Sequence, residues 1–242
     1  MRIRILAAVV VAMTAFAVGS AIADDDKSDS PWTMSAELGF VVTGGNTDTT
    51  SLNGKFNVTY EEVWWRHSGQ LEVLSTSTDN VTSSEHYQAQ AKSDYKLNEY
   101  DYVFGLVNLD KDRFSGFEYQ HTVSGGYGRR VMDTDDMQLD LEIGAGVRFT
   151  EPEGGELGEE GLIRLAGKYA WEITDYSNFT QDLTVDIGEV LTVTKSVSSV
   201  RADINSTLAM KFSVTLKNNS EVPVGSKKTD TETTLNLVYT FQ

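Results

Sequence analysis

The residues best suited to acid–base chemistry in this 242-residue sequence are three histidines, His67, His86 and His121. Hydrolysis of a lipid ester by a serine nucleophile needs a histidine base, and the two must stand two residues apart to share one face of a strand. No H-x-S triplet occurs: His67 directly precedes a serine, and His121 stands three residues before one. We therefore expect no enzyme. A lipid-modifying enzyme stays as an alternative that needs a histidine and a serine to meet across neighbouring strands.

The composition excludes several other chemistries. The chain has no cysteine, which removes disulfides, thiolate metal sites and a cysteine nucleophile, and three histidines leave little for a zinc enzyme. Lysine and arginine number 20 against 36 acidic residues, a formal charge of −16, whereas nucleic-acid binding needs clustered basic residues. We expect no cofactor, no metal and no nucleic-acid partner.

Two acidic segments match cation-binding loops only in part. The segment Glu151–Glu160 could collect divalent cations beside lipopolysaccharide phosphates, but a solvated loop kept soluble by its charge is the favoured interpretation. The run Asp110–Asp112 begins like a calcium loop, yet Phe114 stands where a third oxygen ligand is needed. We predict an extracellular turn at this run, in which Arg113 pairs with a neighbouring carboxylate.

The first residues predict export. A basic head at Met1–Arg4 precedes an apolar run from Ile5 to Val18, and Ala21–Ala23 forms an A-x-A cleavage signal. The apolar run is shorter than the ~18 residues of a membrane-spanning helix. We therefore predict a signal peptide over 1–23, cleaved after Ala23, and a periplasmic segment over 24–31.

Beyond the predicted signal peptide, apolar and polar residues alternate. In the segment 138–149, every second residue from Leu139 to Phe149 is apolar and the residues between are polar or glycine. This period of two predicts a strand with one apolar and one polar face. The same alternation predicts twelve strands, at 32–43, 52–60, 65–75, 86–97, 102–109, 118–129, 138–149, 162–172, 177–188, 196–208, 210–217 and 230–241.

The connections between these segments alternate in length. Tight turns follow the even-numbered segments, down to the single residue Ala209, and longer loops such as 76–85 follow the odd-numbered ones. Short periplasmic turns, longer extracellular loops and an even strand number are typical of outer-membrane proteins. We therefore predict an all-β fold, an antiparallel transmembrane β-barrel of about twelve strands over 32–242. Ten strands is the alternative if 102–109 and 196–208 pair irregularly.

Aromatic residues collect at the short-turn ends of the predicted strands, which is where a membrane interface would hold them. A soluble β-sandwich, the alternative fold, would spread its aromatic residues along the strands. All three prolines fall outside the predicted strands, as full pairing of every strand requires. The predicted periplasmic girdle consists of Trp32, Tyr60, Trp64, Trp65, Tyr95, Tyr102, Tyr127, Trp171, Tyr176, Tyr239 and Phe241.

The C-terminal strand carries a further signal. Its residues alternate from Leu235 to Phe241 and end in an aromatic residue, followed by Gln242. This pattern resembles the signal by which outer-membrane proteins are recognised by their insertion machinery. We expect that machinery, outer-membrane lipid and lipopolysaccharide as partners, in the outer membrane of a Gram-negative-type bacterium. The sequence predicts no oligomeric state.

Three segments resemble a known family. They are the G-N-T segment Leu38–Thr50, the D-R-F segment Asp110–Tyr119, and Gly125–Gly128. Together they are similar to the YdiY-like family, whose members are described as salt-induced outer-membrane proteins and form a domain of unknown function. The resemblance runs from Trp32 to Phe241 and implies a barrel in the outer membrane. It supplies no catalytic residues.

Strand parity places nearly equal numbers of acidic and basic side chains inside the barrel. Paired charges would close the lumen, whereas charges that face each other across water would leave it open. Twelve strands lie between small filled barrels and wide porins. We expect a closed barrel with a structural role in the envelope, and a narrow diffusion channel for small solutes or ions is the alternative. The predicted lumen-lining charges are Glu37, Lys55, Glu72, Lys92, Asp94, Asp140, Glu142, Arg148, Arg164, Lys168, Asp182, Asp186, Arg201, Asp203 and Lys211.

Overall fold

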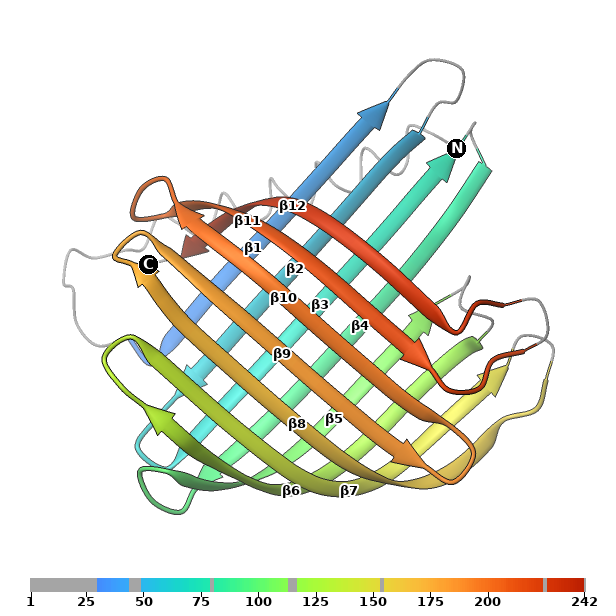
Figure 1. The fold of residues 1–242 in the computed structure, drawn as a ribbon, viewed down its shortest axis with the longest axis horizontal. Helices are drawn as coiled ribbons and strands as arrows, with labels where there is room; N and C mark the ends of the chain where they lie inside the picture. Colours follow the sequence, from blue (N-terminus) through green and yellow to red (C-terminus); the bar gives the residue numbers. More distant parts are fainter. Residues whose placement is uncertain are drawn as a thin grey trace. The chain divides into compact units, whose positions relative to one another are not determined.

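The computed structural model describes residues 30–43, 49–78, 81–112, 117–152, 155–223 and 226–241. The predicted signal peptide, Arg113 and Gln242 lie outside these ranges. Within them the chain forms twelve strands (Figure 1). They are β1 (Trp32–Thr43), β2 (Thr49–Glu61), β3 (Trp65–Thr78), β4 (Val81–Lys96), β5 (Asp101–Asp112), β6 (Phe117–Asp133), β7 (Met137–Pro152), β8 (Gly158–Thr174), β9 (Ser177–Gly188), β10 (Thr192–Asp203), β11 (Leu208–Asn219) and β12 (Thr229–Phe241).

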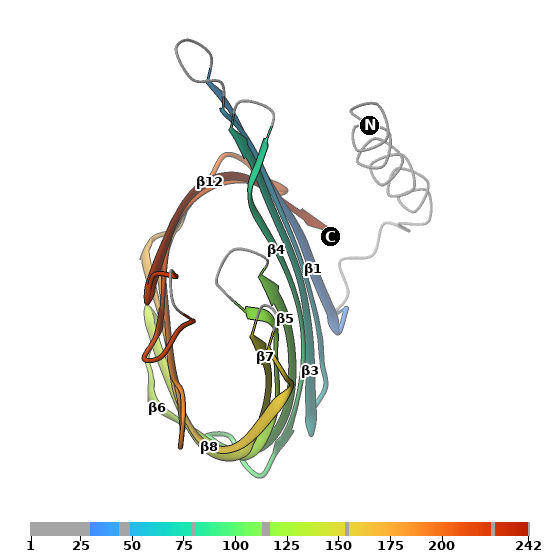
Figure 2. The ribbon, with the colours of Figure 1, turned by 90° about the vertical axis from the view of Figure 1, so that its right-hand side faces the viewer.

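The strands close into one antiparallel barrel. Each strand pairs with its neighbours in sequence, and β12 pairs with β1 to complete the ring. Figure 2 looks along the barrel and shows that this ring is flattened rather than circular. The predicted twelve-stranded antiparallel barrel is confirmed, and the ten-strand alternative is wrong. Among the described residues, no helix is long and apolar enough to cross a membrane.

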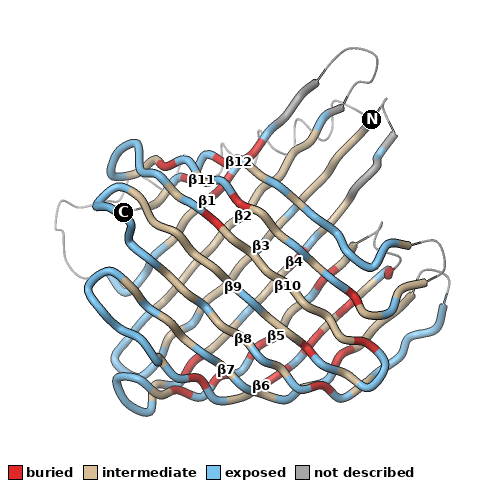
Figure 3. Tube along the Cα trace, in the orientation of Figure 1, coloured by how far each residue is buried: buried red, intermediate tan, exposed pale blue. Residues whose placement is uncertain are grey.

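The outer wall is apolar and the inner wall is polar, as the alternation of the sequence predicts. On β7, the outward side chain of Ile143 is 56% exposed, whereas the inward Arg148 is only 2% exposed. In Figure 3 exposed, intermediate and buried residues follow one another along the strands, with long intermediate stretches on some of them. A protein that presents isoleucine and leucine outward and buries arginine inward is built for a lipid exterior.

Most strands run further than predicted at the long-loop rim. The predicted loop 76–85 is a connection between Thr78 and Val81, because the serine- and threonine-rich ends of β3 and β4 stay paired there. Asp110–Asp112 belongs to β5 and pairs with β4 and β6, so the predicted extracellular turn at this run is wrong. Its charges are therefore held in the wall rather than in a loop.

The boundary between β10 and β11 also differs from the prediction. The strand predicted at 196–208 is shifted to Thr192–Asp203, and the turn lies at 204–207 instead of at Ala209. The reason is the side chain of Asn205, whose Oδ1 accepts hydrogen bonds from the backbone N–H groups of Thr207 and Leu208, each at 2.9 Å. An asparagine that mimics a backbone turn in this way ends the strand early.

Strand β5 turns an apolar face into the lumen. Tyr102, Phe104 and Leu106 form a buried cluster on the inner wall, with 6%, 6% and 3% exposure. Tyr102 therefore does not belong to the lipid-facing girdle, and that part of the prediction is wrong. Glycines on the next two strands make the room, because a Cβ at Gly128 would overlap the Tyr102 ring and one at Gly144 would press on Phe104.

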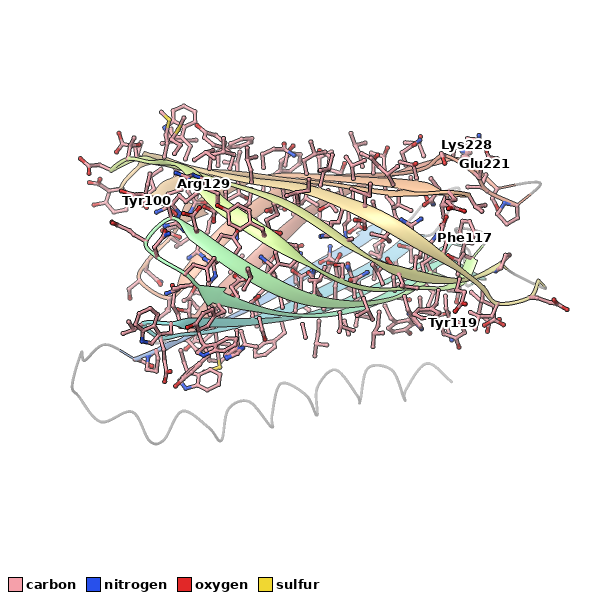
Figure 4. All side chains as sticks on the ribbon, turned by 90° about the horizontal axis from the view of Figure 1, so that it is seen from below. Tyr100, Phe117, Tyr119, Arg129, Glu221 and Lys228 are labelled. Carbon is pink, nitrogen blue, oxygen red and sulfur yellow. The ribbon has the colours of Figure 1, made fainter. Side chains whose placement is uncertain are left out.

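The other girdle residues gather at the short-turn rim. Trp32 lies 4.6 Å from Tyr60 and Trp65 lies 5.0 Å from Tyr95, measured between ring centroids. Figure 4 shows the two ends of the barrel, with Tyr100 at this rim. The exposed aromatic residues here are Trp32, Trp64, Trp65, Tyr95, Tyr127, Trp171, Tyr176 and Tyr239.

Candidate functional site

The lumen holds an elongated polar cavity of about 610 Å³, lined by residues of ten strands, β2 to β11. It extends from Arg130 and Gln138, close to the short turns, to Lys217 and Val193 in the long-loop half. Ten of the predicted lumen charges line it: Lys55, Lys92, Asp94, Asp140, Glu142, Arg148, Arg164, Lys168, Asp182 and Asp186. The other five lie outside this lining in ion pairs: Glu37 with Lys211, Glu72 with Lys55, and Arg201 with Asp203.

A charged network crosses the inner wall in the short-turn half. Arg66 contacts Asp94 at 2.7 Å, and Lys92 lies 3.1 Å from the other oxygen of that carboxylate. The Lys92 amine also bonds to Glu142, which reaches it from β7 across two intervening strands. The Tyr102 hydroxyl donates to Glu142 at 2.8 Å. Both cations lie over the Tyr102 ring, so the apolar face of β5 supports the network.

Two contacts join opposite walls in the long-loop half. Lys217 on β11 lies 3.2 Å from Asp110 on β5, and Lys195 on β10 donates to Gln88 on β4 at 2.9 Å. His86 Nε2 lies 3.2 Å from the second Asp110 oxygen. These contacts span half the ring of strands and narrow the lumen at this level. The sequence prediction missed Asp110 because its D-K-D-R surroundings indicate a turn.

Arg148 lines the cavity, and its hydrogen bonds hold the wall together. Its guanidinium donates to Glu160 at 3.0 Å and to the backbone carbonyls of Leu191 and Asp186 at 2.6 and 2.9 Å. Glu160 in turn accepts the backbone N–H of Val190. This arginine therefore fastens the β9–β10 connection against the inner wall, with every contact charge-assisted.

One row of inward charges, on β7, β8 and β9, is only partly paired. Lys168 on β8 stands in register between Asp140 on β7 and Asp182 on β9. Asp140 pairs with Arg130 at 2.9 Å, whereas neither Lys168 nor Asp182 forms an ion pair with any described residue. Lys168 is also exposed although it faces inward. Its ammonium group is therefore available to an ion in the cavity.

The outer wall brings a histidine and a serine together. His67 on β3 and Ser93 on β4 are register partners, and His67 Nδ1 lies 2.8 Å from Ser93 Oγ. The Trp65 ring stacks on His67 at 5.5 Å. The sequence prediction left open a pair formed across neighbouring strands but did not identify these two residues, because strand register is not encoded in the local pattern. Among the described residues, no group of three potential metal ligands is assembled.

The fold and lumen define a class. A closed antiparallel barrel with an apolar exterior and a charged interior is the architecture of outer-membrane β-barrel proteins. Residues 36–241 match the family model described as "Protein of unknown function, DUF481", and the chain belongs to this family. It is 30% identical over 223 residues to the uncharacterized protein YdiY of Escherichia coli (strain K12), covering 90% of this chain and 86% of that one.

Solved structures with the same architecture include two channels. The NanC porin matches with a TM-score of 0.53 and 11% identity, covering 86% of this chain and 99% of that chain. The COG4313 outer membrane channel from Pseudomonas putida F1 matches with a TM-score of 0.50 and 12% identity, covering 90% of this chain and all of that chain. At these identities the likeness concerns the fold.

Proposed function

We propose that this protein is a narrow channel for small hydrophilic solutes and ions in the outer membrane of a Gram-negative-type bacterium. One observation carries the proposal: the polar cavity of about 610 Å³ that follows the lumen past ten strands. A closed barrel would need its inner charges paired throughout, whereas Lys168 and Asp182 face the cavity without an ion-pair partner among the described residues. The apolar outer wall supports contact with outer-membrane lipid and lipopolysaccharide.

The proposed constriction is the pair of contacts between opposite walls, Lys195 with Gln88 and Lys217 with Asp110. Solutes that cross must pass beside these groups, so the channel selects first by size. Because both signs of charge meet there, we expect weak discrimination among small neutral and zwitterionic solutes.

Swelling of liposomes that contain the refolded protein tests this proposal. We expect swelling in solutions of glycine and small polyols that slows as solute size rises. Lys195→Ala should speed the entry of the larger solutes, because it removes a side chain that crosses the lumen. Lys228→Ala is the matched control, since Lys228 lies on the β11–β12 connection and is 57% exposed. If the protein is inserted in the liposomes and they still do not swell, the channel proposal is contradicted.

That negative result would favour the closed barrel with a structural role in envelope integrity, the function expected from the sequence; the family resemblance adds only that expression is salt-induced. A deletion strain that loses viability at high salt, and regains it with the Lys195→Ala variant as well as with the unaltered chain, would then fit a structural role.

The His67–Ser93 contact favours a second candidate, a lipid-modifying enzyme whose serine attacks a phospholipid ester at the short-turn rim. Release of fatty acid from phosphatidylethanolamine vesicles, abolished by Ser93→Ala and by His67→Ala, would establish it. Among the described residues, no carboxylate orients the His67 ring, and for this reason the channel is the better supported function.

A further inference from the structure

The seam between β1 and β12 is much shorter than the other strand junctions. Pairing runs from Met34 with Phe241 to Leu38 with Leu237 and covers less than half the length of any other pairing in the described barrel. The strands themselves do not end there. β1 stays paired to β2 as far as Thr43, and β12 stays paired to β11 back to Thr229. Within the described residues, both strands therefore have edges without a pairing partner in the long-loop half.

These free edges begin within the apolar band of the wall. Phe40 on β1 and Leu235 on β12 point outward just beyond the last pair, with 63% and 56% exposure. In Figure 2 one end of β1 extends beyond the ring, whereas β12 follows the ring away from it. Backbone N–H and C=O groups cannot face hydrocarbon without a hydrogen-bonding partner, and an exposed strand edge presents a row of such groups. The free edges therefore need polar partners.

The point of separation has its own chemistry. Gly39 is the first residue of β1 past the last pair, and the amide oxygens of Asn53 and Asn236 occupy the space where its side chain would be. Both oxygens are shielded and have no hydrogen-bond partner in the described part of the chain. Asn236 is 7% exposed, and its amide nitrogen donates to Glu37 at 3.3 Å.

We propose that the barrel wall opens laterally between β1 and β12 in the long-loop half, and that the headgroup of a zwitterionic membrane lipid with a primary ammonium group, such as phosphatidylethanolamine, enters the lumen there. Such a molecule can make both the polar and the apolar contacts that the opening offers. Its polar head meets the free backbone edges and the two asparagine oxygens, while its apolar chain lies against Phe40 and Leu235.

The charge at the opening points to a zwitterionic head. Glu37 is already matched by Lys211, whose amine lies 2.9 Å from it. At the point of separation the site thus offers hydrogen bonds, and the inward carboxylates of Asp230 and Glu232 further along the free edge of β12 match the ammonium group of such a head. This inference extends the proposed channel by adding a route through its wall, and it is tested separately from conductance.

Disulfide trapping tests the opening itself, because the chain has no cysteine of its own. The variant Leu38→Cys/Leu237→Cys places two thiols at a paired position, and Phe40→Cys/Leu235→Cys places them at the next position of the same parity. Disulfides form only when the Cα atoms lie within about 7 Å. We expect the first pair to oxidise readily in phosphatidylcholine vesicles and the second at least about tenfold more slowly. Equal rates would show a closed seam and overturn the proposal.

Lipid entry is tested with a bimane fluorophore at Asn236→Cys in vesicles that contain phosphatidylethanolamine with a nitroxide at the top of its acyl chain. We expect stronger quenching there than at Lys168→Cys, an inward position on β8 away from the seam. Thr234→Cys, the next inward position on β12, replaces Asn236→Cys if that variant fails to fold. Equal quenching at both sites would overturn the proposal. Quenching at the seam in a protein without conductance would support the lateral opening and contradict the channel. Conductance without quenching at the seam would support the channel and contradict the lateral opening.

Discussion

Replacing Lys217 by methionine keeps the length of the side chain and removes the charge that holds β11 to β5 across the lumen. The Lys217 amine lies 3.2 Å from Asp110, and the two side chains are 11% and 10% exposed. At an effective dielectric constant of about 20, two charges at that distance attract by about 5 kcal/mol before desolvation is subtracted. Breaking a buried pair by removing one partner costs about 3–5 kcal/mol. His86 remains bonded to Asp110, so we expect a loss near the lower end, about 3 kcal/mol.

Urea unfolding in phosphatidylcholine vesicles, followed by tryptophan fluorescence, measures this loss. A double-mutant cycle with Asp110→Asn isolates the pair, and we expect a coupling free energy of about 1–3 kcal/mol. The control cycle uses Lys228 and Glu221, which lie 3.6 Å apart at 57% and 69% exposure and should couple by less than about 1 kcal/mol. Coupling at Lys217–Asp110 no larger than in the control would refute a bridge across the lumen.

Two further predictions concern the wall. Arg148→Leu should free the β9–β10 connection and destabilise the barrel by about 3–5 kcal/mol. Faster hydrogen exchange at Leu191, with unchanged exchange in β2, would show that the connection is released locally. Unchanged exchange at both places would contradict the role of Arg148 in holding the connection. Gly128→Val should displace the Tyr102 ring and lower the temperature at which the folded form is lost on heat-modifiable gels. Combining this variant with Tyr102→Ala should restore part of that temperature. If it does not, the Tyr102 ring does not fill the space beside Gly128.

The alternation of residues was sufficient to predict the fold, because a period of two fixes which face of each strand is apolar. It failed at β5, where Val103 and Val107 on one face and Phe104 and Leu106 on the other are both apolar. The glycines opposite that strand could have resolved the ambiguity. A run of glycines at inward positions of neighbouring strands, such as Gly144, indicates a large side chain packed against them.

The charged site was predictable residue by residue but not as a set of contacts. Parity places Lys92 and Glu142 inside, yet it does not say that they meet across two strands. The pairing of Lys217 with Asp110 depends on the full ring of strands and their register, which local patterns do not encode. The short seam between β1 and β12 was not predictable for the same reason, since the alternation of residues is unbroken through both strands.

Single-channel recording of the refolded protein in a planar bilayer, with a salt gradient across it, tests the central claim most directly. We expect discrete conductance steps, and a reversal potential that moves toward cation selectivity in Lys168→Glu, because this residue faces the cavity without an ion-pair partner among the described residues. The same change of charge at Lys228, outside the cavity, should move it less. A silent bilayer, with insertion of the folded barrel shown by heat-modifiable gel mobility, would contradict an open lumen.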